Sequence, residues 1–214
     1  MVDLTERLEQ VKEMVDAGQY FTINRARQYG KTTMLKALAN FLKEDYVVAS
    51  LDFQKMSFTN FASEQAFVVA FAGELLDCVT GLPDRTEKKL QALAEGNIGS
   101  LTLSVLFRAL NGWCAEAEKR VVLMIDEVDS ATNNQVFLDF LAQLRGCYIG
   151  RDAKPTFQSV ILTGVYDVRN IKRKLRTEEE HKTNSPWNIA ADFLIEMSFS
   201  VRDIAGMLEE YEKD

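Results

Sequence analysis

The sequence predicts an α/β fold of three layers, in which helices cover both faces of a mainly parallel central sheet of about five strands. Two patterns and the size of the chain support this prediction. A strand-like run at residues 19–24, a helical run at 33–42 and a second strand-like run at 46–53 follow the order of a crossover unit in a parallel sheet. The run at 121–125 is apolar without interruption, as suits a strand covered on both faces. The 214 residues, 47% of them hydrophobic, can bury a sizeable core as one domain.

The remaining elements follow from the spacing of apolar residues. Residues 4–16 repeat them at helical spacing and stop at Ala17-Gly18, which predicts a helix within residues 1–17. Residues 60–118 are largely helical in pattern, with a break at Gly81-Leu82-Pro83, and form an insert before the strand at 121. The chain is completed by a helix at 133–148, a strand at 159–164, a last strand at 193–199 and a last helix at 201–213.

The loop that joins the first strand to the second helix has the composition of a phosphate-binding site. A helix start offers unpaired backbone N–H groups and partial positive charge to an anion. In this interpretation Lys31 spans the β- and γ-phosphates, Thr32 supplies a hydroxyl ligand to Mg²⁺, and Gly30 lets the backbone approach. Thr33 adds a hydroxyl near the α-phosphate. An ordinary helix N-terminus that binds nothing is the alternative, and this motif alone does not decide between them.

The loop departs from the Walker A pattern at one position. That pattern has glycine six residues before the lysine, where this chain has Arg25. Glycine there permits an unusual backbone, so either the loop takes a different path or Arg25 tolerates that conformation. Arg25 and Arg27 bring positive charge beside the phosphates, unless both are solvated loop arginines. Gln28 and Tyr29 complete the predicted nucleotide-binding segment, which runs from residue 25 to residue 33.

Two carboxylates follow the apolar strand at 121–125. Ligands of a parallel sheet bind beyond the carboxyl ends of its strands, which places Asp126 where the Mg²⁺ of a bound nucleotide would lie. Glu127, one residue further on, points to a different side and suits the deprotonation of an attacking water. The alternative is a buried strand followed by a polar turn. Together with the Gly-Lys-Thr loop, the pair favours a nucleoside-triphosphate site.

Two further polar residues end predicted strands. Thr163 closes the strand at 159–164 and, if that strand lies beside the Asp126 strand, can touch the γ-phosphate or the attacking water. Its alternative is a hydrogen bond to local backbone. Asp52 closes the strand at 46–53 and either approaches the metal region or, as the stronger expectation, makes an ordinary turn.

Composition excludes several classes of protein. His181 is the only histidine and the three cysteines are widely spaced, so a catalytic triad, a zinc site and a disulfide framework are not expected. The formal charge of −7 argues against a surface built wholly for nucleic acid, although the basic run at 169–176 leaves a local contact open. No signal peptide or membrane-spanning run is visible, so the expected location is cytoplasmic, with no membrane partner.

Residues 21–33, 123–127, 164–168 and 185–193 together resemble the bacterial AAA-ATPase-like family, and the resemblance extends from about Gly18 to Tyr211. It implies a P-loop ATPase of the additional-strand class, with Lys31 and Thr32 on phosphate and Mg²⁺, Asp126 as Walker B acid and Glu127 as catalytic base. Residues 1–199 would then form the ATPase core and 200–214 the start of a helical lid whose remainder is absent. Members often continue into a restriction-endonuclease-like nuclease domain, which nothing in this chain matches.

Three functions are compatible with these residues. The leading hypothesis is Mg²⁺-dependent ATP binding and hydrolysis that drives an attached domain or a partner, since a poised Glu127 serves hydrolysis. A nucleotide-gated binding module with little intrinsic hydrolysis is the second, and a small-molecule kinase is the third. ATP and Mg²⁺ are the expected cofactors. The missing nuclease-like or other domain is a candidate partner, and both a homo-oligomer and a contact with nucleic acid stay open.

Overall fold

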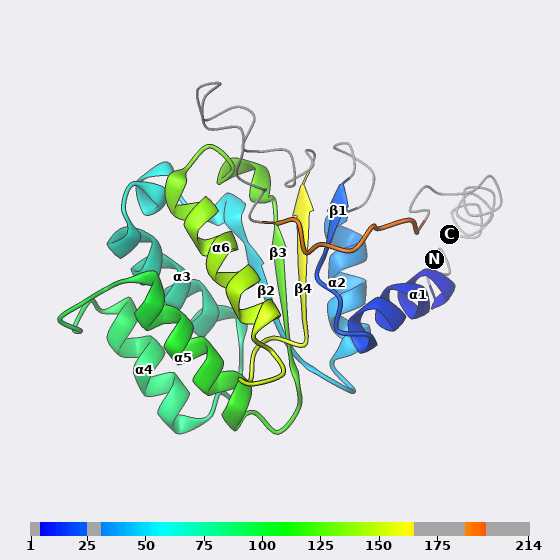
Figure 1. The fold of residues 1–214 in the computed structure, drawn as a ribbon, viewed down its shortest axis with the longest axis horizontal. Coiled ribbons are helices and arrows are strands. Elements are labelled where there is room, and N and C mark those ends of the chain that lie inside the picture. Colours follow the sequence, from blue (N-terminus) through cyan, green and yellow to red (C-terminus); the bar gives the residue numbers. More distant parts are fainter. Residues whose placement is uncertain (1–4, 25–30, 165–186, 196–214) are drawn as a thin grey trace, which may run out of the picture.

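In the described residues of the computed structural model, the central sheet has four parallel strands in the order β1-β4-β3-β2, where the sequence predicts about five (Figure 1). The structure describes residues 5–24, 31–164 and 187–195, and of residues 31–33 it describes the backbone alone. The strands are β1 (Phe21–Asn24), β2 (Val47–Asp52), β3 (Val121–Asp126) and β4 (Ser159–Gly164). The strand that comes last in this set, β4, lies between β1 and β3, so the sheet order departs from the chain order.

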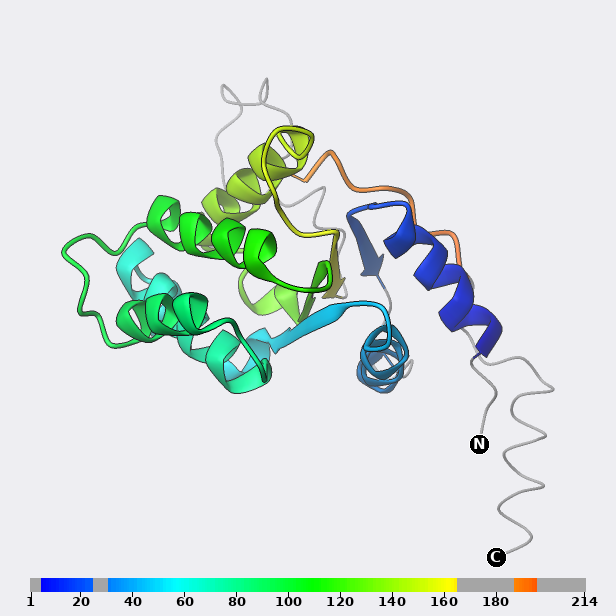
Figure 2. The same cartoon turned by 90° about the horizontal axis from the view of Figure 1, so that it is seen from below.

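Helices cover the sheet on both faces, which confirms the predicted α/β fold (Figure 2). On one face lie α1 (Thr5–Asp16) and α2 (Lys31–Leu42). The other face carries α3 (Glu64–Cys78), α5 (Leu103–Glu116) and α6 (Gln135–Ile149), with α4 (Asp84–Ala94) packed on α3 and α5. The chain between β2 and β3 is therefore largely helical, and it builds most of the layer on this second face.

Alternation along β3 explains why both faces need cover. Leu123 and Ile125 pack into the core beneath α3, α5 and α6, whereas Val122 and Met124 pack into the core beneath α1 and α2. All six residues of β3 and of β4 are buried. An uninterrupted apolar run is stable only in this environment. Successive side chains of the strand point to opposite faces of the sheet, and on each face they find apolar neighbours.

The larger core is built around phenylalanine rings. Phe140 of α6 contacts Phe71 of α3 and Phe107 of α5, with ring centroids 5.1 and 5.4 Å apart. Phe53, directly after β2, meets Phe137 of α6 at 5.9 Å in an edge-on arrangement. Such pairs contribute beyond their buried area and so fix the helical layer against the carboxyl end of β2.

Residues 187–195 run beside β1 at the edge of the sheet (Figure 1). The Ala191 N–H donates to the Tyr20 carbonyl at 2.7 Å, and the Phe193 ring stacks on Phe21 at 5.7 Å. The predicted last strand begins at residue 193, but the described part of this segment forms a single parallel bridge between Ala191 and Phe21. Residues 196–214, with the predicted last helix and lid, lie outside the described residues, so the division at residue 199 stays a prediction.

A tryptophan fixes this edge segment to β1. Trp187 is fully buried, and its indole N–H donates to the Thr22 hydroxyl at 2.8 Å. Its ring also stacks on Tyr20, with centroids 6.0 Å apart. This contact holds the strand that leads into residue 25 from the outer side.

The three cysteines are free and half-buried. Burial raises the pKa of the Cys78 thiol to about 11 and that of the Cys114 thiol to about 12. These two side chains are therefore protonated, weakly reactive thiols at neutral pH. In the described part of the chain, each helix is too short or too polar to cross a bilayer.

Replacing Thr22 by valine tests the edge contact. Thr22→Val keeps the shape of the side chain but removes the acceptor of the buried Trp187 indole, and it should lower the free energy of unfolding by about 1–3 kcal/mol. Urea unfolding monitored by tryptophan fluorescence measures the change. Thr80→Val, at an exposed position, should change stability by less than about 0.5 kcal/mol. Equal stability of the two variants would contradict the assigned role of this hydrogen bond.

Candidate functional site

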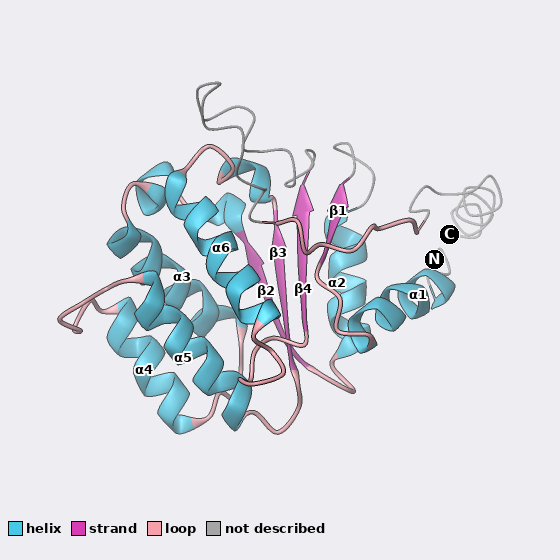
Figure 3. Ribbon diagram, viewed as in Figure 1, coloured by secondary structure: helices cyan, strands magenta, loops and turns pink. Residues whose placement is uncertain are grey.

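The carboxyl edge of the sheet collects the ends of all four strands (Figure 3). Asn24 at the end of β1 lies in register with Gly164 at the end of β4, and Asp52 of β2 lies in register with Asp126 of β3. Because the strands are parallel, the segments that follow them leave from one edge. Because β4 lies between β1 and β3, Thr163 stands between β1 and the carboxyl end of β3.

Asp126 is the buried carboxylate at this edge, with 7% of its surface exposed. Its Oδ1 accepts a hydrogen bond from the Thr163 hydroxyl of the neighbouring strand. The same oxygen accepts the backbone N–H of Glu127 at 2.9 Å. A buried carboxylate is costly without such donors, and two donors on one oxygen fix the plane of the group.

The backbone turns sharply at Glu127. With φ 53° and ψ 43° it is the one non-glycine residue of the described chain that has a positive φ. Left-handed backbone costs an ordinary residue roughly 1–2 kcal/mol, so tertiary structure holds Glu127 in place. The Ser130 hydroxyl donates to the Glu127 carbonyl at 3.0 Å and closes the turn that becomes the short helix η3 (Val128–Ser130). The Glu127 side chain consequently leaves the strand direction and is only partly buried.

Asp129 packs against the end of β4. A Cβ atom placed on Gly164 would lie 3.0 Å from both carboxylate oxygens of Asp129, closer than ordinary contact distance. Glycine at position 164 therefore allows the η3 turn to approach the neighbouring strand. Sequence reasoning assigned no role to this pair, and only a glycine that directly follows an apolar strand could have indicated it.

The predicted phosphate loop meets this edge through β1 and α2. The backbone of α2 begins at Lys31, so Gly-Lys-Thr stands at the start of a helix that follows β1. Arg25, Arg27, Gln28, Tyr29 and Gly30 lie outside the described residues, as do the side chains of Lys31, Thr32 and Thr33. The roles predicted for them stay predictions.

Asn24, to which sequence reasoning assigned no role, ends β1 immediately before that loop. Its side-chain Oδ1 is buried and has no hydrogen-bond donor among the described residues. Buried polar atoms are normally paired, so this oxygen can accept a further hydrogen bond.

Two sequence expectations are resolved at the same edge. Asp52 accepts the backbone N–H of Gln54 at 2.9 Å and caps the short helix η1 (Phe53–Lys55), which is the turn role that the sequence favoured. The Thr163 hydroxyl bonds the Asp126 carboxylate and not local backbone, and Thr163 is fully buried. Its predicted contact with a γ-phosphate or a water stays a prediction.

The donor set suits Mg²⁺ held together with phosphate. No group of three or more histidine, cysteine, aspartate or glutamate side chains converges in the described residues, so a cage made of such side chains is not formed there. Mg²⁺ commonly takes one or two protein oxygens and completes its shell with water and phosphate oxygens. The fixed Asp126 carboxylate at the carboxyl end of β3 fits this mode of binding.

Comparison with known proteins gives one family match and several matches to solved structures. A family model described as an AAA-like domain matches residues 4–212. No curated protein matches the chain. Among solved structures, Cdc6p from Pyrobaculum aerophilum matches with a TM-score of 0.56 at 16% identity, over 99% of this chain and 49% of that one. The Orc1 protein of Aeropyrum pernix, solved in complex with DNA, matches with a TM-score of 0.51 at 12% identity, over 100% of this chain and 50% of that one.

A third match is the Drosophila ORC bound to AT-rich DNA and Cdc6, with a TM-score of 0.53 at 14% identity, over 96% of this chain and 30% of that one. The chain thus spans half or less of the length of these structures. At such identities the likeness establishes the fold alone.

The contact between Asp129 and Gly164 can be tested by a double-mutant cycle. Gly164→Ala should lower the free energy of unfolding by about 1–3 kcal/mol, because the added methyl displaces the Asp129 carboxylate. In an Asp129→Ala background the same change should cost less, since the opposing oxygens are gone. Denaturant unfolding of the four proteins gives the coupling. If the changes in the free energy of unfolding are additive, the side chain at position 164 and the Asp129 carboxylate do not interact.

Proposed function

Since the chain belongs to the AAA-like domain family, a family of nucleotide-binding ATPase modules, we propose that it binds ATP with Mg²⁺ and hydrolyses it. The observation that carries the proposal is the arrangement at the carboxyl edge of β3. There the oriented Asp126 carboxylate and the turned Glu127 follow β3, and the start of α2 follows β1, with β4 between these two strands at the same edge of the sheet. This is where ligands of parallel α/β sheets bind.

The phosphates would be held by the start of α2. Backbone N–H groups of its first turn have no partner within the helix and attract an anion, and Lys31 adds a full positive charge. Arg25 and Arg27 would stand beside the phosphates from the preceding loop, and Asn24 Oδ1 is available to a donor in that loop or to a bound water. In this proposal the helix N–H groups and the three cationic side chains bind and orient the triphosphate, whereas the Asn24 oxygen, an acceptor, does not touch it.

Asp126 and the Thr32 hydroxyl would hold the Mg²⁺. An ion held by these two residues would supply neutralisation of the charge on the phosphates. The protein's own contribution is the orientation of Asp126, because Thr163 and the Glu127 amide both bond one oxygen and so fix where the carboxylate points. In this proposal Thr163 acts as a positioning residue for Asp126.

Glu127 would take the proton of the attacking water. Its left-handed backbone separates its side chain from Asp126, although the two residues are adjacent in sequence. One carboxylate is thus assigned to the metal and the other to the water, without competition for one partner. The turn at Glu127 continues into η3 and α6, a direct connection by which we propose that the nucleotide state is coupled to an attached domain or a partner.

Substitution of Lys31 and Glu127 separates binding from hydrolysis. Lys31→Ala should abolish the heat of Mg²⁺–ATP binding in calorimetry, since it removes the charge on the phosphates. Glu127→Gln should keep the binding heat and lower steady-state phosphate release by roughly 10²- to 10⁴-fold, the usual contribution of a general base.

Glu9→Gln changes an exposed glutamate of α1 and should leave both measurements as in the parent. Binding without turnover in the parent itself would instead favour a nucleotide-gated switch. Retained ATP binding in Lys31→Ala would contradict the site.

Replacement of Thr163 tests its positioning role. Thr163→Val removes the hydroxyl at nearly constant volume and should raise the Mg²⁺ concentration for half-maximal phosphate release by about 10- to 100-fold, as expected when a ligand loses its supporting hydrogen bond. Thr163→Ser keeps the hydroxyl and should restore the parent midpoint. A valine variant with lower stability but an unchanged Mg²⁺ midpoint would assign Thr163 to packing alone.

A further inference from the structure

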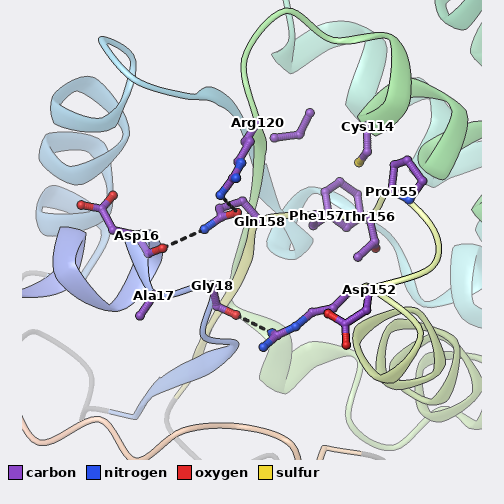
Figure 4. A pocket seen from close by; sticks show the side chains of 12 residues that line it. Asp16, Ala17, Gly18, Cys114, Arg120, Asp152, Pro155, Thr156, Phe157 and Gln158 are labelled. Carbon is purple, nitrogen blue, oxygen red and sulfur yellow. Dashed lines mark hydrogen bonds between the residues drawn. The ribbon is translucent and has the colours of Figure 1, made fainter.

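A cavity of about 460 Å³ lies at the opposite, amino-terminal edge of the sheet (Figure 4). Its walls come from the turn between α1 and β1, the start of β3, and the connection from α6 to β4. Small-molecule sites commonly occupy roughly 300–1,000 Å³, so the space suits a compact ligand. The nucleotide site that we propose above is formed by the other ends of the same strands, and this cavity shares no residue with it.

Arg120 reaches the cavity from the start of β3. Its Nη1 donates to the Gln158 side-chain oxygen at 3.0 Å. Gln158 is itself fixed, because its Nε2 donates to the Val15 carbonyl at 2.9 Å and to the Asp16 carbonyl at 3.0 Å. Figure 4 shows the bond to Asp16. A chain of uncharged partners therefore orients the Arg120 guanidinium and leaves its other N–H groups available.

Arg151 reaches the same cavity from the connection that precedes β4. Its Nη1 donates to the Gly18 carbonyl at 2.9 Å, and its guanidinium lies 4.0 Å from the centre of the Tyr148 ring. Within the described part of the chain, neither Arg151 nor Arg120 forms an ion pair with a carboxylate. A cavity wall thus carries two oriented guanidinium groups whose charge the described protein does not pair.

The carboxylates nearby do not cancel this charge. Asp16 contributes to the wall but uses its carboxylate elsewhere, accepting hydrogen bonds from Tyr46 at 2.5 Å and from Lys12 at 2.9 Å. Burial alone would raise the pKa of Asp16, and these two hydrogen bonds outweigh it and lower that pKa. In Figure 4 the Asp16 carboxylate lies away from Arg120. Asp152 is the second carboxylate of the wall, so two positive charges face one acidic group that is not already engaged.

We propose that this cavity binds a small organic anion whose carboxylate or phosphate groups are held by Arg120 and Arg151. The planar guanidinium donates paired N–H groups to either kind of anion, and its fixed orientation reduces the ordering that binding costs. Val121, Pro155 and Phe157 give the cavity an apolar side for the carbon skeleton of the ligand. Such a ligand joins the α1–β1 turn to the start of β3.

Calorimetric titration of Lys31→Ala with citrate, and separately with inorganic phosphate, tests the cavity without the nucleotide site. Sodium chloride keeps the ionic strength constant. We expect saturable binding of one of the two anions, and the stronger of them identifies the ligand as a carboxylate or a phosphate. Arg120→Gln and Arg151→Gln should each weaken that binding by at least about tenfold, since each removes a charge-assisted partner. All three arginine substitutions are made in the Lys31→Ala protein. Arg108→Gln, at an exposed arginine of α5, should bind the anion as tightly as Lys31→Ala alone does.

Failure of the inference would be equally clear. It is overturned if neither anion binds, or if binding is the same in the Arg120→Gln, Arg151→Gln and Arg108→Gln proteins. Should a glutamine variant not fold, Arg120→Lys and Arg151→Lys replace it, because lysine keeps the charge and loses the paired donors. Unchanged affinity in those lysine variants would also overturn it. If the unsubstituted chain does not bind ATP, that result counts against the proposed nucleotide site alone. The cavity is tested in the Lys31→Ala protein, in which the nucleotide site is already disabled.

Discussion

The buried carboxylate of Asp126 is the constraint on which the candidate site depends. A charge at the end of a covered strand is tolerated only with fixed donors, and here these are the Thr163 hydroxyl and the Glu127 amide. The first requires that β4 lie directly beside β3, and the second is given by a backbone that turns at Glu127. From this turn follow the η3 helix and the close approach of Asp129 to Gly164.

The same strands organise both edges of the sheet. Their buried centres separate two apolar cores, and the charged side chains of the strands, Asp52 and Asp126, stand at strand ends. At the carboxyl edge the available groups are carboxylates and a helix start, which suit a metal-bound triphosphate. At the amino edge they are two oriented arginines around a cavity, which suit an anion without metal. In our proposals, one apolar scaffold thus carries two sites of different chemistry.

Much of the fold could be predicted from sequence, because long apolar runs report burial directly. The strand at 159–164 has the predicted bounds, and β2 lies within the predicted 46–53. Of the predicted last strand, residues 193–195 form no strand and the remainder lies outside the described residues. The bridge at Ala191 was not predicted, because it depends on contacts of Trp187 and Phe193 with β1, which is distant in sequence. The position of Asp126 and Glu127 at the carboxyl end of a buried strand could be predicted from the apolar run, and their chemical roles stay predictions. The left-handed backbone of Glu127 and the Asp129–Gly164 contact could not, because tertiary packing alone imposes them.

The central claim is that Asp126 holds the metal of a bound nucleotide, and Mn²⁺ used in place of Mg²⁺ tests it most directly. Electron paramagnetic resonance measures free Mn²⁺ during titration of the chain with and without ATP. The account predicts one Mn²⁺ bound per chain when ATP is present, with affinity at least about tenfold lower in Asp126→Asn although ATP still binds. Equal Mn²⁺ affinity of the parent and the Asp126→Asn variant in the presence of ATP would contradict it.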